Sequence, residues 1–271
     1  MEKKIASIII PAYNEEKKIK TVLDRLSFTD LFQVVVVCNG CIDSTFDVAK
    51  SYLGVEVYDL EQGSKTLALN FGDSVSHFFP RIYLDADIDF DVSSLIDLVD
   101  YMNSSEVLAS GPNLNFNYSN APFLVRCYYS VWSNLPYILS SSNVGSGVFA
   151  LSMSGRERFD DFPDVISDDG FVNFIFSDVE KGRPSSCFVN VDVPKSFWSL
   201  VKIKARATAG ASQLASIGVK THRKNKIDFG FFKKFGFKGV LYVAIQSFIK
   251  LYGAVYYSKS NRGWLRDETN R

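Results

Sequence analysis

Histidine and cysteine are scarce in this sequence. Only His77 and His222 occur among 271 residues, so a mechanism that depends on histidine acid–base chemistry has few candidates. There are four cysteines, and the first apolar run, over residues 5–11, is too short for the hydrophobic core of a signal peptide. Both features predict a protein of the reducing cytosol that has no disulfides.

The chain also has no net charge, with 30 Lys and Arg against 30 Asp and Glu, and this balance predicts no nucleic-acid partner. This zero net charge is the sum of an acidic and a basic part of the chain. Residues 1–200 carry 15 basic and 27 acidic side chains, whereas residues 201–262 carry 13 basic side chains and a single acidic one, Asp228. This asymmetry predicts a basic surface in the C-terminal part that faces phosphate groups or anionic lipid.

No hydrophobic run is long enough to span a bilayer, which needs ~20 residues. The apolar run between Lys238 and Lys250 has 11 residues. Segment 233–262 therefore fits a helix that lies in the membrane interface, where each Lys or Arg contributes about 1 kcal/mol toward anionic lipid. The alternatives are a helix packed on the domain and a contact between two subunits. The predicted apolar face comprises Leu241, Ile245, Phe248, Tyr252 and Val255.

Patterns of β-strand and α-helix alternate over the first hundred residues. Apolar runs of strand length are followed each time by residues with helical spacing. The order predicts an α/β fold with a mainly parallel sheet, helices on both faces and right-handed crossovers. Ligands bind such sheets beyond the carboxyl ends of their strands. The predicted strands cover residues 5–11, 33–38, 55–60 and 81–84, and a basic helix is predicted over 199–214.

Four aspartates follow the fourth predicted strand in the stretch LDADIDFD. Asp85 and Asp87 point the same way if the chain stays extended, because strand side chains alternate. Two carboxylates at a ligand-binding edge predict a site for Mg²⁺ or Mn²⁺ that keeps waters and completes its shell with substrate phosphates. An EF-hand is excluded, since Phe90 stands where that loop needs Gly and Ile96 where it needs Glu. The alternative is a solvated turn in which Asp91 caps the next helix.

The turn after the second predicted strand contains Cys38-x-x-Cys41. Its spacing resembles a redox dithiol, and a zinc site would need a second cysteine pair that the sequence does not contain. Asn39, Gly40 and Asp43 in the same turn favour a different role, because a tight polar turn between strand and helix can hold a nucleobase or a ribose.

The turn after the first strand, PAYNEE, has both a structural and a functional interpretation. Pro11 is predicted to end the strand, Asn14 to cap the helix, and Glu15 and Glu16 to favour the positive helix N-terminus. The same residues lie at the predicted ligand edge, beside the other two polar turns.

A second acidic pair, Asp168 and Asp169, opens an apolar helical segment. One carboxylate is predicted to cap that helix, and the other can serve as a general base toward a hydroxyl group. Gly145 and Gly147 precede a further predicted strand, where they permit a close approach of the backbone to a ligand. The segment is not G-x-S-x-G, which argues against a serine hydrolase.

Six segments within residues 5–180 resemble, as an ordered set, the inverting family 2 glycosyltransferases of the GT-A fold: SIIIPAYNEE, VVVVCNGCIDST, GSKTLALNFG, LDADI, GSGVFALS and ISDDGFV. The resemblance implies transfer of a sugar from a nucleotide-diphosphate donor with a divalent metal, Mn²⁺ or Mg²⁺. It implies Asp87 as the direct metal ligand, Asp85 as a contact to ribose or metal, and Asp169 as the base. The nucleotide pocket would be lined by Pro11, Tyr13, Glu15, Asn39, Asp43 and Lys65.

Three departures from the family pattern matter. Cys38-Asn39 stands where many members have two aspartates, one of which reads the uracil imide, so the nucleotide base stays open. The acidic pair is Asp168-Asp169 where many relatives have Glu-Asp, which leaves the assignment of the general base intact. The Gln-x-x-Arg-Trp motif and the several membrane spans of processive synthases are missing, which predicts one transfer per binding event.

These observations predict a catalytic domain over residues 1–200, with a nucleotide-sugar half to about residue 110 and an acceptor half over 111–200, and a basic helical extension over 201–271. In the extension, Lys202, Lys204 or Arg206 can reach the diphosphate, and Arg206 is the favoured candidate. The predicted activity is a metal-dependent inverting glycosyl transfer to a lipid-linked saccharide of bacterial polysaccharide or glycan assembly, on the cytoplasmic face of the membrane. The alternatives are a nucleotidyltransferase of similar fold and a non-catalytic membrane-binding module.

Overall fold

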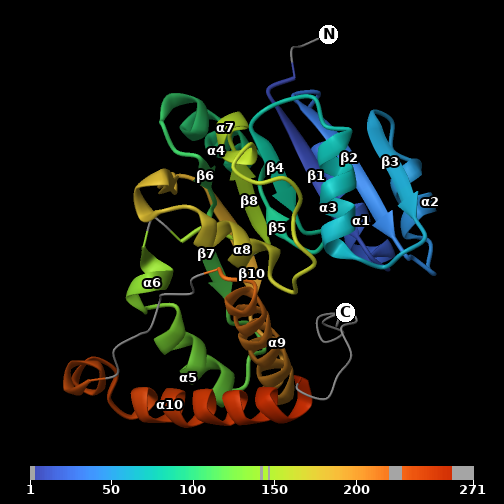
Figure 1. Cartoon of the computed structure of the whole chain (residues 1–271). Coiled ribbons are helices and arrows are strands. Elements are labelled where there is room, and N and C mark those ends of the chain that lie inside the picture. The colour runs from blue at the N-terminus through green and yellow to red at the C-terminus, as the bar shows by residue number, and fades with distance from the viewer. Residues whose placement is uncertain (1–3, 141–142, 146, 220–227, 258–271) are drawn as a thin grey trace.

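The computed structural model describes residues 4–140, 143–145, 147–219 and 228–257 of the chain. Two sheets form the centre of this part (Figure 1). The larger sheet has the strand order β3-β2-β1-β4-β8-β6-β9, and the smaller has the order β5-β10-β7. In those orders, the strands of the larger sheet are Val55–Leu60, Phe32–Asn39, Ala6–Ala12, Arg81–Leu84, Val148–Leu151, Ala109–Ser110 and Lys181–Gly182. The strands of the smaller sheet are Asp89–Phe90, Phe188–Asp192 and Asn113–Asn117.

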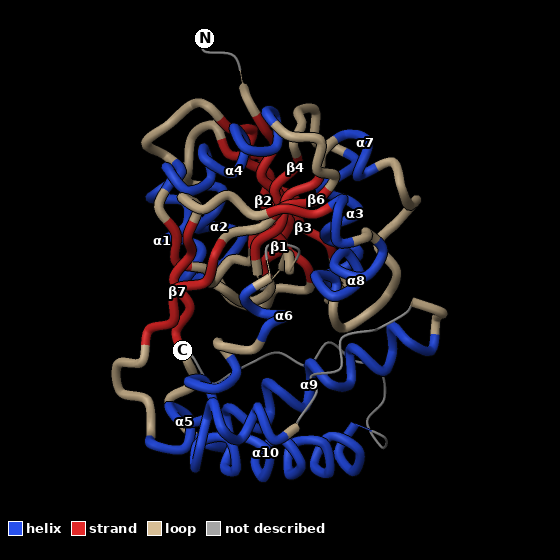
Figure 2. Tube along the Cα trace, turned by 90° about the vertical axis from the view of Figure 1, so that its left-hand side faces the viewer, coloured by secondary structure: helices blue, strands red, loops and turns tan. Residues whose placement is uncertain are grey.

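Helices surround the sheets, and a separate group of helices forms a layer at one end of the molecule (Figure 2). The helices around the sheets are α1 (Glu16–Leu26), α2 (Thr45–Lys50), α3 (Lys65–Ser74), α4 (Val92–Ser104), α7 (Met153–Arg156) and α8 (Asp168–Ile175). The others are α5 (Phe123–Trp132), α6 (Pro136–Leu139), α9 (Phe197–Ser216) and α10 (Phe229–Tyr257). A short 3₁₀ turn covers Asp178–Glu180.

The four strands predicted from apolar runs are present, and the mainly parallel sheet is confirmed. β1 pairs in parallel with β2 and β4, and β2 pairs in parallel with β3. In this sheet β8 runs antiparallel to both of its neighbours, β4 and β6. The four parallel strands therefore end at one edge, at Ala12, Asn39, Leu60 and Leu84, and β8 begins there. Pro11 was predicted to end the first strand but lies inside β1.

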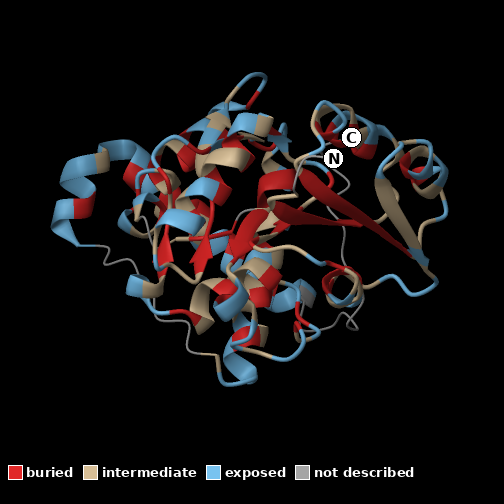
Figure 3. Cartoon of the chain, turned by 90° about the horizontal axis from the view of Figure 1, so that it is seen from above, coloured by how far each residue is buried: buried red, intermediate tan, exposed pale blue. Residues whose placement is uncertain are grey.

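Alternate residues of the strands bury the two faces of the larger sheet under different helices. One face carries Ile8, Val36 and Leu84 and packs against α1, α2 and α4. The other face carries Ile9 and Tyr83 and packs against α3, α8 and α9. Since both faces are covered, the strands read as continuous apolar runs rather than as alternating ones. Figure 3 shows the buried strands in the centre and the exposed outer sides of the helices.

The layer of α5, α9 and α10 has an apolar core of its own. This core contains Val125 and Tyr128 from α5, Leu200 from α9 and Ile249 from α10. α10 runs across one end of α9 (Figure 1) and is interrupted at Gly236, whose φ is 53°. The predicted division of the chain at residue 200 falls inside α9.

The apolar face predicted for α10 is wrong in part. Ile245 is buried in the core of the layer together with Ile249, whereas Phe248 and Val255 are exposed. The packing face of α10 depends on the shapes of α5 and α9, which the periodicity of α10 itself does not contain. By length and composition alone, the helix over Phe229–Tyr256 is also long and apolar enough to cross a membrane.

Three helix caps differ from the prediction. Asp91 is the N-cap residue of α4, but its side chain makes no capping hydrogen bond. Asn14, with a φ of 51°, does not cap α1, because its Oδ1 accepts a hydrogen bond from the Ile42 N–H at 2.7 Å. α8 is capped by Ser167 rather than by either aspartate of the acidic pair. Asn14 and Asp168 instead contact residues from distant parts of the chain.

Candidate active site

A lysine joins two carboxylates at the carboxyl edge of the larger sheet. Lys65, the first residue of α3, places its Nζ 2.6 Å from Oδ1 of Asp85 and 3.0 Å from Oδ1 of Asp168. Asp85 directly follows β4, and Asp168 opens α8. Ser64 caps α3 by accepting a hydrogen bond from the Leu67 N–H, which holds the start of that helix at the edge. Three segments far apart in sequence thus form one charged cluster.

Burial governs the protonation of this cluster. Burial raises the pKa of Asp168 to about 6, although the Lys65 ammonium group opposes the rise. Burial also raises the pKa of Asp85, and Lys65 again acts in the opposite direction. For Lys65 itself, burial would lower the pKa, but the charges of the two carboxylates outweigh burial and raise its pKa above the ordinary value. Lys65 therefore stays positively charged at neutral pH.

Asp87 fits the direct ligand of a divalent cation. The residue is exposed, and its carboxylate makes no ion pair within the described part of the chain, whereas Asp85 is held by Lys65. The protein atoms around the carboxylate nevertheless raise the pKa of Asp87, and the charge of Glu15 adds to this effect. Among the described residues, no group of three His, Cys, Asp or Glu side chains is placed to hold a metal ion. A cation here would need substrate phosphates to complete its shell.

Two glycines let the loop before β8 pass between the carboxylates. A Cβ atom on Gly145 would lie 2.9 Å from the Cβ of Asp169, and one on Gly147 would lie 2.5 Å from Cδ1 of Ile88. Both glycines have a positive φ, 111° and 87°, which disfavours any side chain. The Gly147 carbonyl accepts a hydrogen bond from the Asp85 N–H at 2.8 Å. The loop thus connects the aspartate-rich turn to the start of α8.

Asp169 lies half-buried next to the lysine cluster. Its Oδ1 accepts hydrogen bonds from the Gly170 N–H at 2.7 Å and from the Ser167 hydroxyl at 2.8 Å. Its other oxygen, Oδ2, lies on the side of Gly145. A carboxylate that is fixed by hydrogen bonds in this way can serve as a base toward a hydroxyl group. Ser167 was not predicted as part of the site, although a serine before a helical pattern is a known N-cap signal.

Asn39, at the end of β2, carries a buried acceptor that has no partner among the described atoms. Its Nδ2 donates to the carbonyl oxygens of Ala12 at 2.9 Å and Val37 at 3.4 Å. Because only an amide N–H can satisfy those carbonyls, the orientation of the amide is fixed. Its Oδ1 is left buried and unsatisfied. Such an acceptor costs about 1–3 kcal/mol until a donor reaches it.

Three strand-to-helix turns converge near this amide. A Cβ atom on Gly63 would lie 3.5 Å from the Tyr13 ring and 3.8 Å from the backbone oxygen of Asn39. Gly40, with a φ of 65°, approaches Gly63 so closely that a Cβ atom would lie 2.8 Å from its nitrogen. Gly63 was not predicted as part of the site. The sequence signal for it was its position directly before Ser64, the N-cap residue of α3. The arrangement matches a ligand site at the carboxyl edge of a parallel sheet.

Asp43 and Glu15 stabilise the turns in which they lie by hydrogen bonds. Oδ1 of Asp43 accepts hydrogen bonds from the N–H of Thr45 at 3.1 Å and from its hydroxyl at 2.5 Å. Oδ2 of Asp43 accepts from the Glu16 N–H at 3.4 Å, and the Glu15 N–H donates to Oγ1 of Thr45 at 2.7 Å. These bonds tie the first two turns together, so any nucleotide contact of Asp43 or Glu15 would be an addition to this structural role.

The cysteine pair lies in the same turns as free thiols. The Asn14 N–H donates to Sγ of Cys41 at 3.4 Å. A hydrogen bond with Cys38 lowers the pKa of Cys41 to about 7, and the same bond together with burial raises the pKa of Cys38. The pair therefore helps to hold the turn that contains Asn39.

Arg206 lies half-buried in the middle of α9. It precedes Gly210 by about one helical turn, and a Cβ atom on Gly210 would lie 2.9 Å from the Cβ of Ser167. The face of α9 that carries Arg206 therefore approaches the start of α8. The contact between Arg206 and a diphosphate stays a prediction.

Comparisons with known proteins agree with this geometry. The family model described as "Glycosyl transferase family 2" matches residues 7–143, which is about half of the chain. No curated protein matches the chain in sequence. Among solved structures, the mannosyltransferase PcManGT from Pyrobaculum calidifontis, in complex with GDP-Man and Mn²⁺, is 16% identical with a TM-score of 0.61, over 96% of this chain and 77% of that one.

Two further structures share the fold. Glucosyl-3-phosphoglycerate synthase from Mycobacterium tuberculosis, in complex with Mn²⁺, UDP and glucosyl-3-phosphoglycerate, is 18% identical with a TM-score of 0.52, over 80% of this chain and 81% of that one. Residues 1–349 of S. aureus TarS are 15% identical with a TM-score of 0.54, over 94% of this chain and 75% of that one.

The family match covers the three converging turns and the aspartate-rich turn, and the structural likeness extends over the lysine cluster and the helical layer. At these identities the solved structures establish the fold alone, which is GT-A, whereas the family model also identifies the activity. The chain therefore is a glycosyltransferase and belongs to glycosyl transferase family 2.

Proposed function

We propose that the protein is a metal-dependent, inverting glycosyltransferase that moves one sugar from a nucleotide-diphosphate donor to a hydroxyl group of a lipid-linked saccharide at the cytoplasmic membrane surface. The observation that carries this proposal is the meeting of Lys65, Asp85, Asp168 and Asp169 beside the exposed Asp87 at one edge of the sheet. Two neighbours in the same fold were solved with Mn²⁺ and GDP-Man or UDP, which supports a donor of this class.

In the proposed reaction, Asp169 takes the proton of the acceptor hydroxyl. The hydroxyl oxygen forms the new bond to the anomeric carbon while the nucleoside diphosphate leaves from the opposite face, so the configuration inverts. Asp168 acts as a positioning residue, because its ion pair keeps Lys65 at the edge. Lys65 supplies a fixed positive charge on the side where the leaving diphosphate develops negative charge.

Asp87 would hold the metal ion, with Asp85 beside it and in contact with Lys65. When bound, a divalent cation neutralises the charge of the leaving diphosphate. Within the described residues, the protein keeps the Asp87 carboxylate exposed and without a cationic ion-pair partner. Lys65 holds the neighbouring Asp85 in place.

Asn39 supports a donor whose base carries a ring N–H group. Since the Nδ2 group is committed to two backbone carbonyls, the side chain offers only an acceptor, as an aspartate would. The imide of uracil or thymine and the N1–H of guanine can donate to it. Cytosine presents an acceptor at the corresponding ring nitrogen, so a CDP-sugar should bind less well.

The outer face of α10 supports residence at a membrane surface. Phe237, Val240, Phe248, Leu251 and Val255 recur at helical spacing and are 40–68% exposed. Lys233, Lys234, Lys238 and Lys250 on the same helix are exposed as well. An apolar stripe flanked by lysines fits an interface between water and anionic lipid. A lipid-linked acceptor would reach the enzyme at such an interface.

A thermal-shift panel tests the donor site. UDP-, GDP-, dTDP- and CDP-sugars are added with and without Mn²⁺, and we expect a Mn²⁺-dependent rise in Tm with one of the first three. Asp87→Ala should abolish the Mn²⁺-dependent part of the rise. Asp91→Ala, an exposed aspartate of the same stretch that makes no capping bond, should leave it unchanged. Equal losses in both variants would contradict the metal assignment.

Flotation with lipid vesicles tests the membrane surface. Wild-type protein should float with vesicles that contain phosphatidylglycerol and less with neutral phosphatidylcholine vesicles. Val240→Glu with Leu251→Glu should abolish flotation, because both charges fall on the exposed stripe. Ser104→Glu, an exposed position of α4, is the matched control for an added charge. Flotation that the double variant retains would exclude the stripe as the membrane contact.

A further inference from the structure

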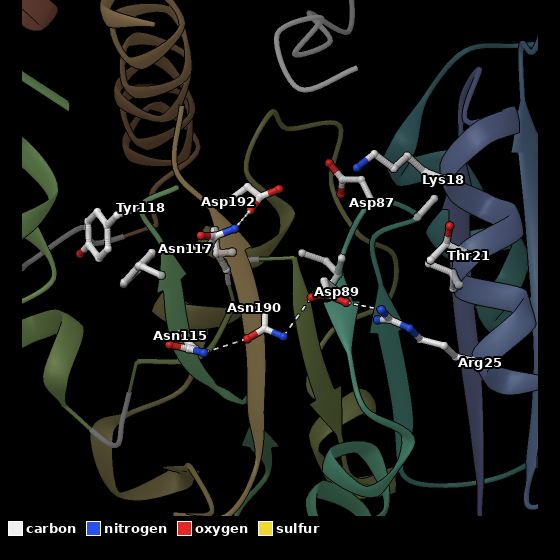
Figure 4. Close-up of a pocket in the computed structure, with 15 residues that line it drawn as sticks. Lys18, Thr21, Arg25, Asp87, Asp89, Asn115, Asn117, Tyr118, Asn190 and Asp192 are labelled. Carbon is white, nitrogen blue, oxygen red and sulfur yellow. Dashed lines mark hydrogen bonds and ion pairs between the residues drawn. The ribbon is translucent and has the colours of Figure 1, made fainter. Parts of the chain in front are cut away.

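Asp87 also lines a polar groove. It has a volume of about 710 Å³ and lies between α1 and the smaller sheet (Figure 4). Lys18 and Asp87 lie at one end of it, and Tyr118 lies on the sheet side. The volume is in the range of sites that enclose a small ligand. Apart from Asp87, the residues that line this groove have no role in the reaction proposed above.

A row of hydrogen-bonded side chains crosses the groove floor. Nδ2 of Asn115 donates to Oδ1 of Asn190 at 2.9 Å, and Nδ2 of Asn190 donates to Oδ2 of Asp89 at 2.9 Å. Arg25 of α1 completes the row with an ion pair to Oδ1 of Asp89. The row thus runs from β7 through β10 and β5 to α1, as the dashed lines in Figure 4 show. Two residues further along β7 and β10, Nδ2 of Asn117 donates to Oδ1 of Asp192 at 2.7 Å.

Strand stability does not account for these residues. Asn115 faces Asn190 and Asn117 faces Asp192 in the parallel pairing of β7 with β10, so all four side chains lie on one face of the sheet. The opposite face carries apolar residues such as Leu114 and packs into the core. Asn and Asp are depleted in strands, where Thr or Val would serve an exposed face better. Their concentration on the groove side points to recognition of a ligand.

The chemistry of the row selects the class of ligand. The groove is lined by two cations, Lys18 and Arg25, and three carboxylates, Asp87, Asp89 and Asp192, so it favours neither an anion nor a strongly charged cation. Each asparagine amide uses one of its two N–H donors within the rows, and the second remains for a ligand. Rigid, alternating donors and acceptors suit a neutral molecule with many hydroxyl groups. The ring of the half-buried Tyr118 in the lining can pack against a sugar ring.

We infer that this groove binds a saccharide, with the amide rows reading its hydroxyl groups. The end at Asp87 would place that saccharide next to the donor, so the inference names the groove as the site of the acceptor glycan. This last assignment rests on the proposed function, whereas binding of a saccharide to the groove does not.

Binding to an array of defined neutral oligosaccharides tests the groove without donor or metal. Labelled wild-type protein should be retained by a subset of glycans that share one structural unit. Asn115→Ala with Asn190→Ala removes the row across the floor and should weaken retention at least about tenfold, as loss of two hydrogen bonds implies. Asn134→Ala, an exposed asparagine at the end of α5, is the matched control and should retain full binding. Circular dichroism checks that all variants fold.

The outcomes separate this inference from the proposed function. Asp91→Ala should bind the same glycans as wild type, because the exposed Asp91 neither lines the groove nor belongs to the proposed active site. No retained glycan, or equal retention by the wild type and the double variant, would overturn the saccharide site while leaving a positive donor panel untouched. A failed donor panel with groove-dependent retention would instead overturn the proposed transfer and keep the saccharide site.

Discussion

The two sides of the aspartate-rich turn use the same side chain in different ways. Asp85 pairs with Lys65, whose side chain is 21% exposed, and burial raises the pKa of this carboxylate. Asp89, four residues later, is exposed and pairs with Arg25 at the surface of a polar groove. The number of charges in the turn therefore says little about how much each one contributes to stability. That contribution depends on how far each charge is removed from water and on what it meets there.

The largest difference between the two sides of the turn is expected in kcat. Asp169→Asn removes the proposed base beside the buried cluster and should lower kcat about 10²–10⁴-fold while the donor-induced rise in Tm persists. Asp89→Asn alters the hydrogen-bonded row of the groove and should raise KM for the acceptor while leaving kcat within about twofold, because it removes no group that acts on the reacting atoms. Release of nucleoside diphosphate, measured with the donor identified by the panel, provides both values. Equal losses of kcat would show that the two sides are not functionally distinct.

The next effect concerns stability. Lys65→Met keeps the length of the side chain but leaves Asp85 and Asp168 without their cation, which should lower the free energy of unfolding by about 3 kcal/mol at neutral pH. Urea denaturation followed by circular dichroism measures it. An unchanged midpoint would mean that the ion pairs add nothing to the stability of the edge.

The pH dependence of stability provides a second test of the buried lysine cluster. The pKa of Asp168 is raised to about 6, so between about pH 4 and pH 6 the unfolded chain gives up this proton before the folded protein does. The free energy of unfolding should therefore fall as pH rises through this window, by an amount on the order of 2 kcal/mol, and show no further change from this group above it. Asp168→Asn should remove that fall relative to wild type. A difference between the two proteins that grows instead above pH 6 would contradict the assignment.

The smallest effect is expected on the exposed side. Arg25→Met removes the partner of Asp89 and should cost at most about 1 kcal/mol, because both side chains are partly solvated. The same urea experiment at low and high salt measures it, and the cost should shrink as salt screens the pair. If Arg25→Met destabilises the protein as much as Lys65→Met, the distinction between the two sides fails.

Several features of the fold were predictable from local sequence. Continuous β-branched runs such as residues 33–38 predict buried strands, because both faces of this sheet are covered by helices. The alternation of strand and helix predicts a parallel sheet, and hence an edge at which Asn39, Asp85 and Lys65 can meet. These predictions succeed because they depend on the periodicity of a few neighbouring residues.

Other features had no local signal. The smaller sheet pairs β5 with β10 and β10 with β7, segments separated by much of the chain, so its amide rows could not be read from any single stretch. α10 is apolar on more than one side, and only α5 and α9 determine that Ile249 packs inward while Leu251 faces out. The predicted caps by Asn14 and by one aspartate of the pair 168–169 were wrong, because Asn14 accepts a hydrogen bond from the Ile42 N–H and Ser167 caps α8.

Local sequence is sufficient to predict the strand and helix order of the first hundred residues, the position of the polar turns at one edge of the sheet, and the family that the motifs resemble. The tertiary structure alone decided which aspartate is held by Lys65, which stays available for a metal ion, and which faces the groove. The physical reason is that periodicity is local, whereas removal from water and pairing depend on residues brought together from distant parts of the chain.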